Sequence, residues 1–336
     1  MTNKSRSGFD DAILAIGVPV LCLTSLLEHY GQRLSARGSI RQYFDGVYAS
    51  RVLGRESVIG LSNAANKFAA LFGYRHESGL LAGWVLTNGI AFMVASILLY
   101  RFSAREDPRL RFAYLLIIAV MAASGVVVTP YDFLSYALII AVFMAISSGR
   151  SWCGVVLMVL AVATRESALV VVPMLAVAAP GPLENGPGLR GQLLKGTLEA
   201  LARTKSTLVV AMVGVSTYVA LKIATLPRGR RPHFVQHVST SGHWSVAGLV
   251  GVVTAVLMAI VIRWVVSVTF DRADVVARCR LLWLLSLPYL VVCLVWGIWG
   301  EAPRLVMPLV LGEFLIAASV LAPSSAVVAA RERASA

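Results

Sequence analysis

Ionisable residues are scarce in this chain of 336 residues: Asp, Glu, Lys and Arg together make up 14% of it. Only 17 residues are acidic, whereas 58% are hydrophobic and the mean hydropathy is +0.77. A soluble chain of this length has too little interior to bury that much apolar surface. The composition therefore excludes a soluble globular protein and predicts an all-α, polytopic helical membrane protein.

Cysteine is also rare and lacks a useful spacing. The four cysteines (Cys22, Cys153, Cys279 and Cys293) lie in or beside apolar runs, and none forms a CxxC pair. Small core residues are therefore a better interpretation than disulfides or metal ligands. Walker, dinucleotide-binding, HExxH and GxSxG motifs are absent as well. We expect no cofactor and no metal site, although a divalent metal remains an unsupported alternative.

The net charge of +13 comes from basic residues that fall between the apolar runs. Anionic lipid headgroups, and the preference of cationic loops for the cytoplasm, explain this distribution more simply than nucleic acid does. Membrane lipids are therefore expected partners, and nucleic acid is not.

About ten apolar runs are long enough, or nearly so, to cross a bilayer. They cover residues 12–27, 80–100, 112–128, 133–147, 153–163, 168–179, 207–226, 244–268, 281–299 and 305–321. The fifth and sixth are short, and together they could form one broken span. No internal repeat and no detachable soluble domain is visible, so a single domain over residues 1–336 is expected.

The basic connectors predict the orientation. Both termini are expected in the cytoplasm of a multi-pass cell-membrane protein, together with loop 181–205. Residues 28–79 would form a long extracytoplasmic loop with interfacial helices, one of them amphipathic over 58–72. Residues 227–243 would form a basic extracytoplasmic loop. Most of the unusual polar residues then lie on the outer side, which favours a site that opens there.

Arg165 and Glu166 interrupt an apolar stretch. A charge at the bilayer midplane costs about 2.5–3.5 kcal/mol on insertion scales, so adjacent charges predict a helix break or a polar site. Neighbouring helical residues point in different directions, which disfavours a pair between these two. We expect Arg165 to reach a lipid phosphate and Glu166 a polar neighbour.

Two lone acids are candidate catalytic residues. Asp45 lies among aromatic residues in the first outer loop, where a partly desolvated carboxylate can act as a general base; the alternative is a helix cap or a pair with Arg41 or Arg51. Asp132 follows a Thr-Pro turn and opens an apolar helix. Capping and dipole stabilisation are its simpler role, and a second acid at the outer mouth is the functional one.

Other charged residues are candidate phosphate ligands, because the guanidinium fork donates two parallel hydrogen bonds to phosphate. They are Arg228, Arg230, Arg231 and His233 in the basic loop, and Glu301 and Arg304 before the last run. The alternative for the basic loop is a patch held by lipid headgroups. Two further charges have structural interpretations: Glu313 pairs inside the bundle, and Arg263 extends to the interface.

These features resemble the GT-C superfamily of integral-membrane glycosyltransferases. The match lies in an acid within a long first outer loop (Asp45 in Tyr43-Phe44-Asp45-Gly46-Val47-Tyr48), an acid that opens the fourth helix (Asp132), a basic break (Thr164-Arg165-Glu166) and an Arg near the last spans (Arg304). It covers mainly residues 12–179. A paired acidic motif and a terminal soluble domain of the superfamily are missing.

The resemblance implies transfer of a sugar from a polyprenyl-phosphate donor to a glycan or lipid acceptor on the outer face. It implies that Asp45 activates the acceptor, while Arg165, with Arg228, Arg230 or Arg304, stabilises the leaving phosphate. The alternatives are a transporter or flippase of a lipid-linked polyanion, and an accessory subunit of an envelope-glycan assembly complex. The sequence does not predict the oligomeric state.

Overall fold

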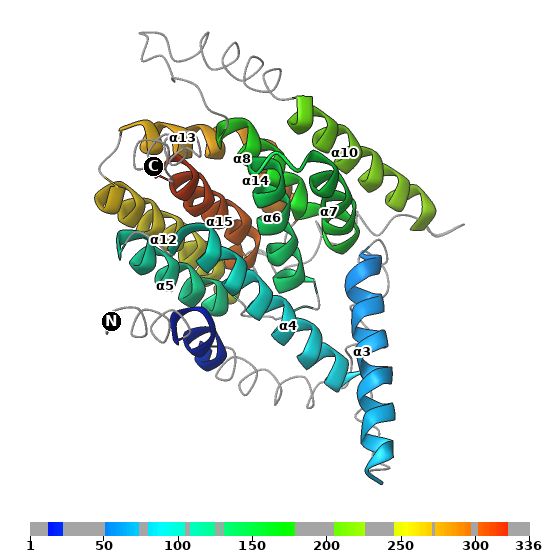
Figure 1. Ribbon diagram of the computed structural model, residues 1–336. Helices are drawn as coiled ribbons and strands as arrows, with labels where there is room; N and C mark the ends of the chain where they lie inside the picture. Colours follow the sequence, from blue (N-terminus) through cyan, green and yellow to red (C-terminus); the bar gives the residue numbers. More distant parts are fainter. Residues whose placement is uncertain are drawn as a thin grey trace, which may run out of the picture.

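The structure is a computed structural model that describes residues 13–22, 51–73, 80–104, 108–124, 129, 131–178, 205–225, 245–270, 273–296 and 302–321. Within these ranges every regular element is a helix (Figure 1). The elements are η1 (Ile13–Gly17), α3 (Val52–Leu71), α4 (Leu81–Leu99), η4 (Tyr100–Ala104), α5 (Pro108–Ala123), α6 (Asp132–Ser147), α7 (Ser151–Thr164), η5 (Glu166–Val170), α8 (Val171–Ala178), α10 (Lys205–Thr225), α12 (Val246–Phe270), α13 (Ala273–Leu285), α14 (Leu287–Trp296) and α15 (Ala302–Leu321).

Four helical segments are long and apolar enough to cross a membrane: Leu81–Phe102, Lys205–Thr225, Gly248–Thr269 and Ala302–Val320. Helices α13 and α14 add a fifth if the pair, bent by 50°, is counted as one span. The other five predicted runs coincide with apolar helices of only 10–17 residues. The all-helical prediction is therefore confirmed for the described residues, but ten full-length spans are not.

The predicted span at 281–299 differs most from the structure. Helix α13 begins earlier, at Ala273, and the helix breaks at Ser286. Pro288 lies just after the break, and its nitrogen cannot donate the helical hydrogen bond to the carbonyl of Leu284. The hydropathy of the run predicted an apolar helical segment, whereas this proline decides where the helix bends.

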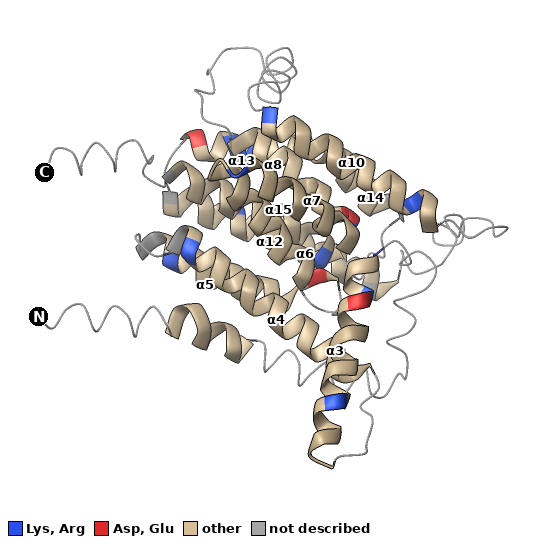
Figure 2. Cartoon of the chain, turned by 45° about the vertical axis from the view of Figure 1, so that its right-hand side comes forward, with Lys and Arg blue, Asp and Glu red and all other residues tan. Residues whose placement is uncertain are grey.

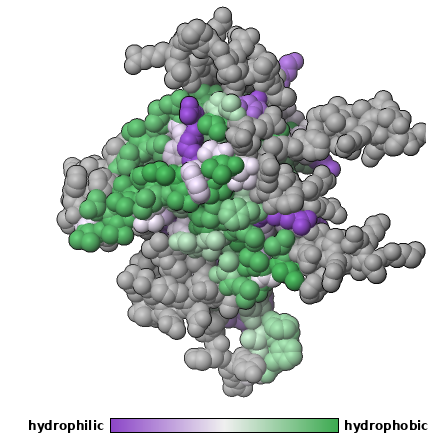
Figure 3. All heavy atoms as spheres, turned by 90° about the vertical axis from the view of Figure 1, so that its left-hand side faces the viewer, coloured by the Kyte–Doolittle hydropathy of each residue, from purple (hydrophilic) through white to green (hydrophobic). Residues whose placement is uncertain are grey.

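Helices α6 and α15 form the centre of the bundle, and α10 and α12 form its outside. Met307, Leu311 and Phe314 of α15 are fully buried. By contrast, α12 exposes a row of large apolar side chains that includes Leu249, Val256 and Ile260. The face with α12 is largely apolar where it is described (Figure 3). An apolar outer surface is what a bilayer requires of a helical bundle.

Charged residues gather at two ends of the bundle (Figure 2). We call the end where α6 and α15 begin and α7 ends the site end. The opposite end holds basic residues that lie in or beside several other helices: Arg101, Arg111, Arg150, Lys205 and Arg278. This separation matches the grouping expected from the connectors, while the cytoplasmic location of the opposite end stays a prediction.

Helix α3 packs against α4 at the site end and projects from the bundle (Figure 1). The two helices meet at Gly83, whose backbone N–H donates to the Ser62 hydroxyl at 3.0 Å. The far end of α3 exposes Phe68, Leu71 and Phe72. The helix predicted over 58–72 therefore exists, and its location in the membrane interface stays a prediction.

Candidate functional site

Five charged residues from distant parts of the chain meet at the site end. We call them the ion cluster: Arg51, Asp132, Arg165, Glu166 and Arg304. Asp132, Arg165 and Arg304 are at most 3% exposed. Such burial of charge in an apolar bundle costs several kcal/mol per ion unless partners compensate it.

Asp132 is the centre of the ion cluster. Its Oδ1 forms an ion pair with Arg165, and its Oδ2 lies 3.4 Å from Nη1 of Arg304. The hydroxyl of Thr129 also donates to Oδ2, at 2.8 Å. Asp132 lies in the first turn of α6, where the helix dipole favours a negative charge. One carboxylate therefore holds two guanidinium groups from α15 and from the end of α7.

A helix break explains how Arg165 and Glu166 reach different partners. Arg165 ends α7 in an extended conformation, with φ −163° and ψ 137°, and Glu166 starts η5. The side chain of Arg165 turns to Asp132, whereas Glu166 accepts two hydrogen bonds from Arg51, at 2.7 and 3.1 Å. The two neighbours do not pair with each other, as their spacing predicted.

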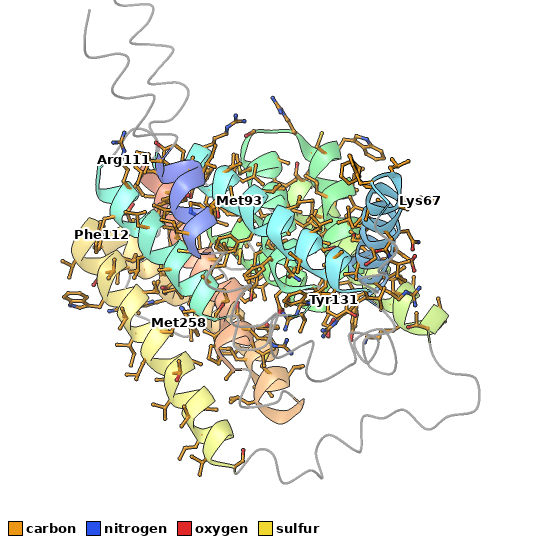
Figure 4. The ribbon with its side chains drawn as sticks, turned by 90° about the horizontal axis from the view of Figure 1, so that it is seen from below. Lys67, Met93, Arg111, Phe112, Tyr131 and Met258 are labelled. Carbon is orange, nitrogen blue, oxygen red and sulfur yellow. The ribbon has the colours of Figure 1, made fainter. Side chains whose placement is uncertain are left out.

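Arg51 joins α3 to the ion cluster. Besides its two bonds to Glu166, its guanidinium lies over the ring of Tyr131, 5.3 Å from the centroid. Tyr131 immediately precedes Asp132 and lies beside α3, away from Arg111 at the opposite end (Figure 4). The first turn of α3 is thus fixed to the loop that opens α6.

A proline positions Arg304. Pro308 lies inside α15 and cannot donate to the carbonyl of Arg304, four residues earlier. The hydroxyl of Tyr136 donates to that carbonyl instead, at 3.1 Å. Tyr289 of α14 donates to the next carbonyl, that of Leu305, at 2.7 Å. Two tyrosines therefore anchor the turn that carries Arg304.

A second buried charge lies deeper in α15. Glu313 is 0% exposed, and its Oε1 accepts hydrogen bonds from Trp283 at 2.7 Å and from Arg263 at 3.1 Å. Arg263 also donates to the carbonyl of Val276. Pairing inside the bundle, the structural interpretation of Glu313, agrees with these contacts. Arg263 was predicted to extend to the interface, but its guanidinium group also donates to Glu313 and to Val276 inside the bundle.

Four of the predicted site residues therefore come together in the ion cluster: Asp132, Arg165, Glu166 and Arg304. The remaining predicted residues lie outside the described part of the chain: Asp45, Arg228, Arg230, Arg231, His233 and Glu301. Arg51 was predicted only as an alternative partner of Asp45, because an arginine in a polar loop carries no local sign of burial. Tyr136 and Tyr289 were missed, and Pro308 inside an apolar run was the available signal.

Among the described residues, no group of three or more His, Cys, Asp or Glu side chains could hold a metal ion. The chemistry of the ion cluster is that of guanidinium groups held by carboxylates, which suits an anion.

No family model, no curated protein and no solved structure matches this chain.

Proposed function

We propose that this protein is a membrane glycosyltransferase that transfers a sugar from a polyprenyl-phosphate donor to a glycan or lipid acceptor at the outer face. The observation that supports it most is the ion cluster at one end of an apolar helical bundle. Within the cluster, three guanidinium groups face two carboxylates. Ionisable residues inside a membrane protein are costly, and they commonly mark its functional site.

A lipid phosphate fits this cluster better than a neutral substrate. Arg165 and Arg304 both contact the carboxylate of Asp132, and guanidinium groups held side by side in this way suit a phosphate. Arg304 also lies in the first turn of α15, where the helix dipole disfavours a cation and favours an anion. Both arginines would stabilise the phosphate as the sugar leaves it.

The contacts of Asp132 favour a positioning role over a catalytic one. Both oxygens of this carboxylate are already engaged, one by Arg165 and the other by Arg304 and the hydroxyl of Thr129. Asp132 would instead hold Arg165 and Arg304 in place. In this proposal Asp45 is the base that removes a proton from the acceptor hydroxyl.

The contribution of the basic loop to the proposal is secondary. The anionic headgroup would be guided from the outer surface by the basic residues of this loop, Arg228, Arg230, Arg231 and His233. Glu301 precedes Arg304 by three positions in the sequence. Lys222 is the basic residue nearest this loop in the described part of the chain, and it interacts electrostatically with Glu166. A cationic approach to the ion cluster is therefore consistent with the described part of α10.

The alternative of a transporter for a lipid-linked polyanion predicts charges that connect the two faces of the membrane. Glu313 is nine positions beyond Arg304 in α15, about 14 Å by helical rise. The eight residues between them carry no charge, and Glu313 pairs with Arg263. The described residues thus favour the enzyme over a carrier. An accessory subunit would need neither the ion cluster nor the pair between Glu313 and Arg263.

The proposal is tested with purified protein in vesicles that contain radiolabelled polyprenyl-phosphate hexoses and an envelope-glycan acceptor. We expect covalent transfer of label by the wild type, and loss of transfer with retained donor binding in Asp45→Asn. Transfer that persists in Asp45→Asn removes the proposed base. Movement of labelled lipid across the bilayer without any covalent product would support the carrier instead.

A further inference from the structure

Helix α4 carries three buried polar side chains, each with a polar atom that lacks a hydrogen-bonding partner among the described residues. Trp84, Thr87 and Asn88 are 0%, 4% and 1% exposed. The indole Nε1 of Trp84, the hydroxyl of Thr87 and Oδ1 of Asn88 have no hydrogen-bonding partner within the described ranges of the chain. Each buried polar group left unpaired costs about 1–3 kcal/mol. Three such groups within two helical turns indicate that they bind a partner other than the described residues.

These groups form one face of α4 close to the ion cluster. Their spacing of three and four residues places them on a single helical face. The same face continues to Phe92, whose ring packs edge-on against Phe133 with centroids 5.0 Å apart. Phe133 follows Asp132, and α4 and α6 both begin at the site end. Asn88 precedes Phe92 by four residues in α4. It therefore lies one helical turn closer to the site end than the contact between Phe92 and Phe133.

The chemistry of this face suits a neutral ligand with hydroxyl groups. An indole N–H donates, a threonine hydroxyl donates and accepts, and an amide oxygen accepts. The amide nitrogen of Asn88 donates to the carbonyl of Trp84 at 3.0 Å, which leaves its oxygen as the acceptor. No residue of Leu81–Leu99 carries a charge, so an ionic headgroup has no counterpart on this helix.

We propose that Trp84, Thr87 and Asn88 bind the sugar ring of the lipid-linked donor while its phosphate binds the ion cluster. This inference rests on the proposed function and extends it to the recognition of the sugar. The donor would then lie along the start of α6, with its phosphate at Arg165 and Arg304 and its sugar directed toward α4.

The test uses the double variant Thr87→Val and Asn88→Leu, which keeps the approximate shape and removes the polar atoms. Apolar replacement of an unpaired polar group is expected to be neutral or stabilising, so lost binding is separated from lost folding. The control is Ser96→Ala, on the same helix, where the buried serine hydroxyl already donates to the Phe92 carbonyl at 2.8 Å. The probes are undecaprenyl phosphate alone and its glucose, mannose and galactose conjugates in nanodiscs.

We expect at least one conjugate to bind the wild type and Ser96→Ala more tightly than undecaprenyl phosphate does. The double variant should lose about tenfold or more of this preference, with unchanged affinity for undecaprenyl phosphate. A preference that the folded double variant retains would overturn the proposal, as would a wild type with no preference for any conjugate. A wild type that fails to bind undecaprenyl phosphate overturns the phosphate site itself, which is a separate result.

Discussion

At the scale of single residues, the account depends on how buried charges find partners. Arg165 and Glu166 are adjacent in the chain, yet they bind Asp132 and Arg51, which are distant in sequence. The helix breaks between the two residues, because Arg165 is extended and Glu166 begins η5. The extended backbone at Arg165 thus accompanies the separation of their partners.

The carbonyl of Arg304 gives a prediction about Tyr136. Replacing Tyr136 by Phe removes the hydroxyl that donates to a buried carbonyl with which Pro308 cannot form the helical hydrogen bond. We expect Tyr136→Phe to lower the free energy of unfolding by about 1–3 kcal/mol, measured by denaturant unfolding in detergent micelles. In a Pro308→Ala background, the helix itself can supply a donor, so the cost should be much smaller. Equal costs in both backgrounds would contradict the assignment.

The pair between Arg51 and Glu166 gives a second prediction. Arg51→Lys loses one of two parallel hydrogen bonds, since an ammonium group is a point donor. The cost should be about 1 kcal/mol, because the Glu166 side chain is 37% exposed and partly solvated. In a double-mutant cycle with Glu166→Gln, the two changes should be non-additive. The matched control is Arg55→Lys, whose partner Glu56 is its neighbour on the surface of α3.

Part of the ion cluster could be predicted from the sequence. Asp132, Arg165 and Arg304 stood out because a charge beside an apolar run is costly. Arg51 could not be identified in the same way, since its burial depends on α3 packing against a helix start 80 positions later. The partners of each charge are set by tertiary contacts that no local spacing encodes.

At the scale of elements, close helix packing determines where α3 is held. A Cβ atom added at Gly83 would lie 2.0 Å from the carbonyl oxygen of Val58 and 2.6 Å from the backbone nitrogen of Ser62. Backbone atoms cannot move aside as a flexible side chain can. The absence of a side chain at Gly83 is therefore a condition for the contact that brings Arg51 to the ion cluster.

Gly83→Ala should consequently separate α3 from α4 and weaken the contact between Arg51 and Glu166. We expect faster hydrogen exchange of the α3 amides and a loss of donor binding, both measured on the protein in nanodiscs. Gly60→Ala is the matched control, because nothing lies within 4 Å of a Cβ at that position of α3. If both variants exchange like the wild type, the α3 contact does not depend on Gly83.

Hydropathy predicted where helices occur better than where they end. Each of the ten apolar runs overlaps a helix, but only four segments reach the length of a span without a bend. The predicted run at 112–128 corresponds to α5, which ends at Ala123. Hydropathy reports which segments are apolar. Helix ends depend instead on residues such as Pro288 and on charges such as Arg165, and the partners of these charges come from distant parts of the chain.

At the scale of the whole molecule, polar chemistry divides between two ends of an apolar bundle. The ion cluster occupies the site end, and the basic residues of the opposite end lie in or beside several other helices (Figure 2). If the opposite end is cytoplasmic, this division follows the preference of cationic segments for that side.

Cysteine labelling in intact cells tests this orientation. Lys67→Cys on α3 and Arg150→Cys before α7 are both exposed positions on different ends of the bundle. A membrane-impermeant maleimide should label Lys67→Cys at once and Arg150→Cys only after permeabilisation. Both variants need a background in which Cys153, the exposed native cysteine, is replaced by Ser. The reverse pattern would place the ion cluster on the cytoplasmic side.

The central claim, that the ion cluster binds a lipid phosphate, is tested most directly by the affinity of undecaprenyl phosphate for the protein in nanodiscs. We predict that Arg165→Gln and Arg304→Gln each weaken binding by about tenfold or more, since each removes a charge-assisted contact. Arg278→Gln is the matched control, because this buried arginine donates to the Val177 carbonyl at the opposite end, and its affinity should equal that of the wild type. Unchanged affinity in folded Arg165→Gln and Arg304→Gln would contradict the claim.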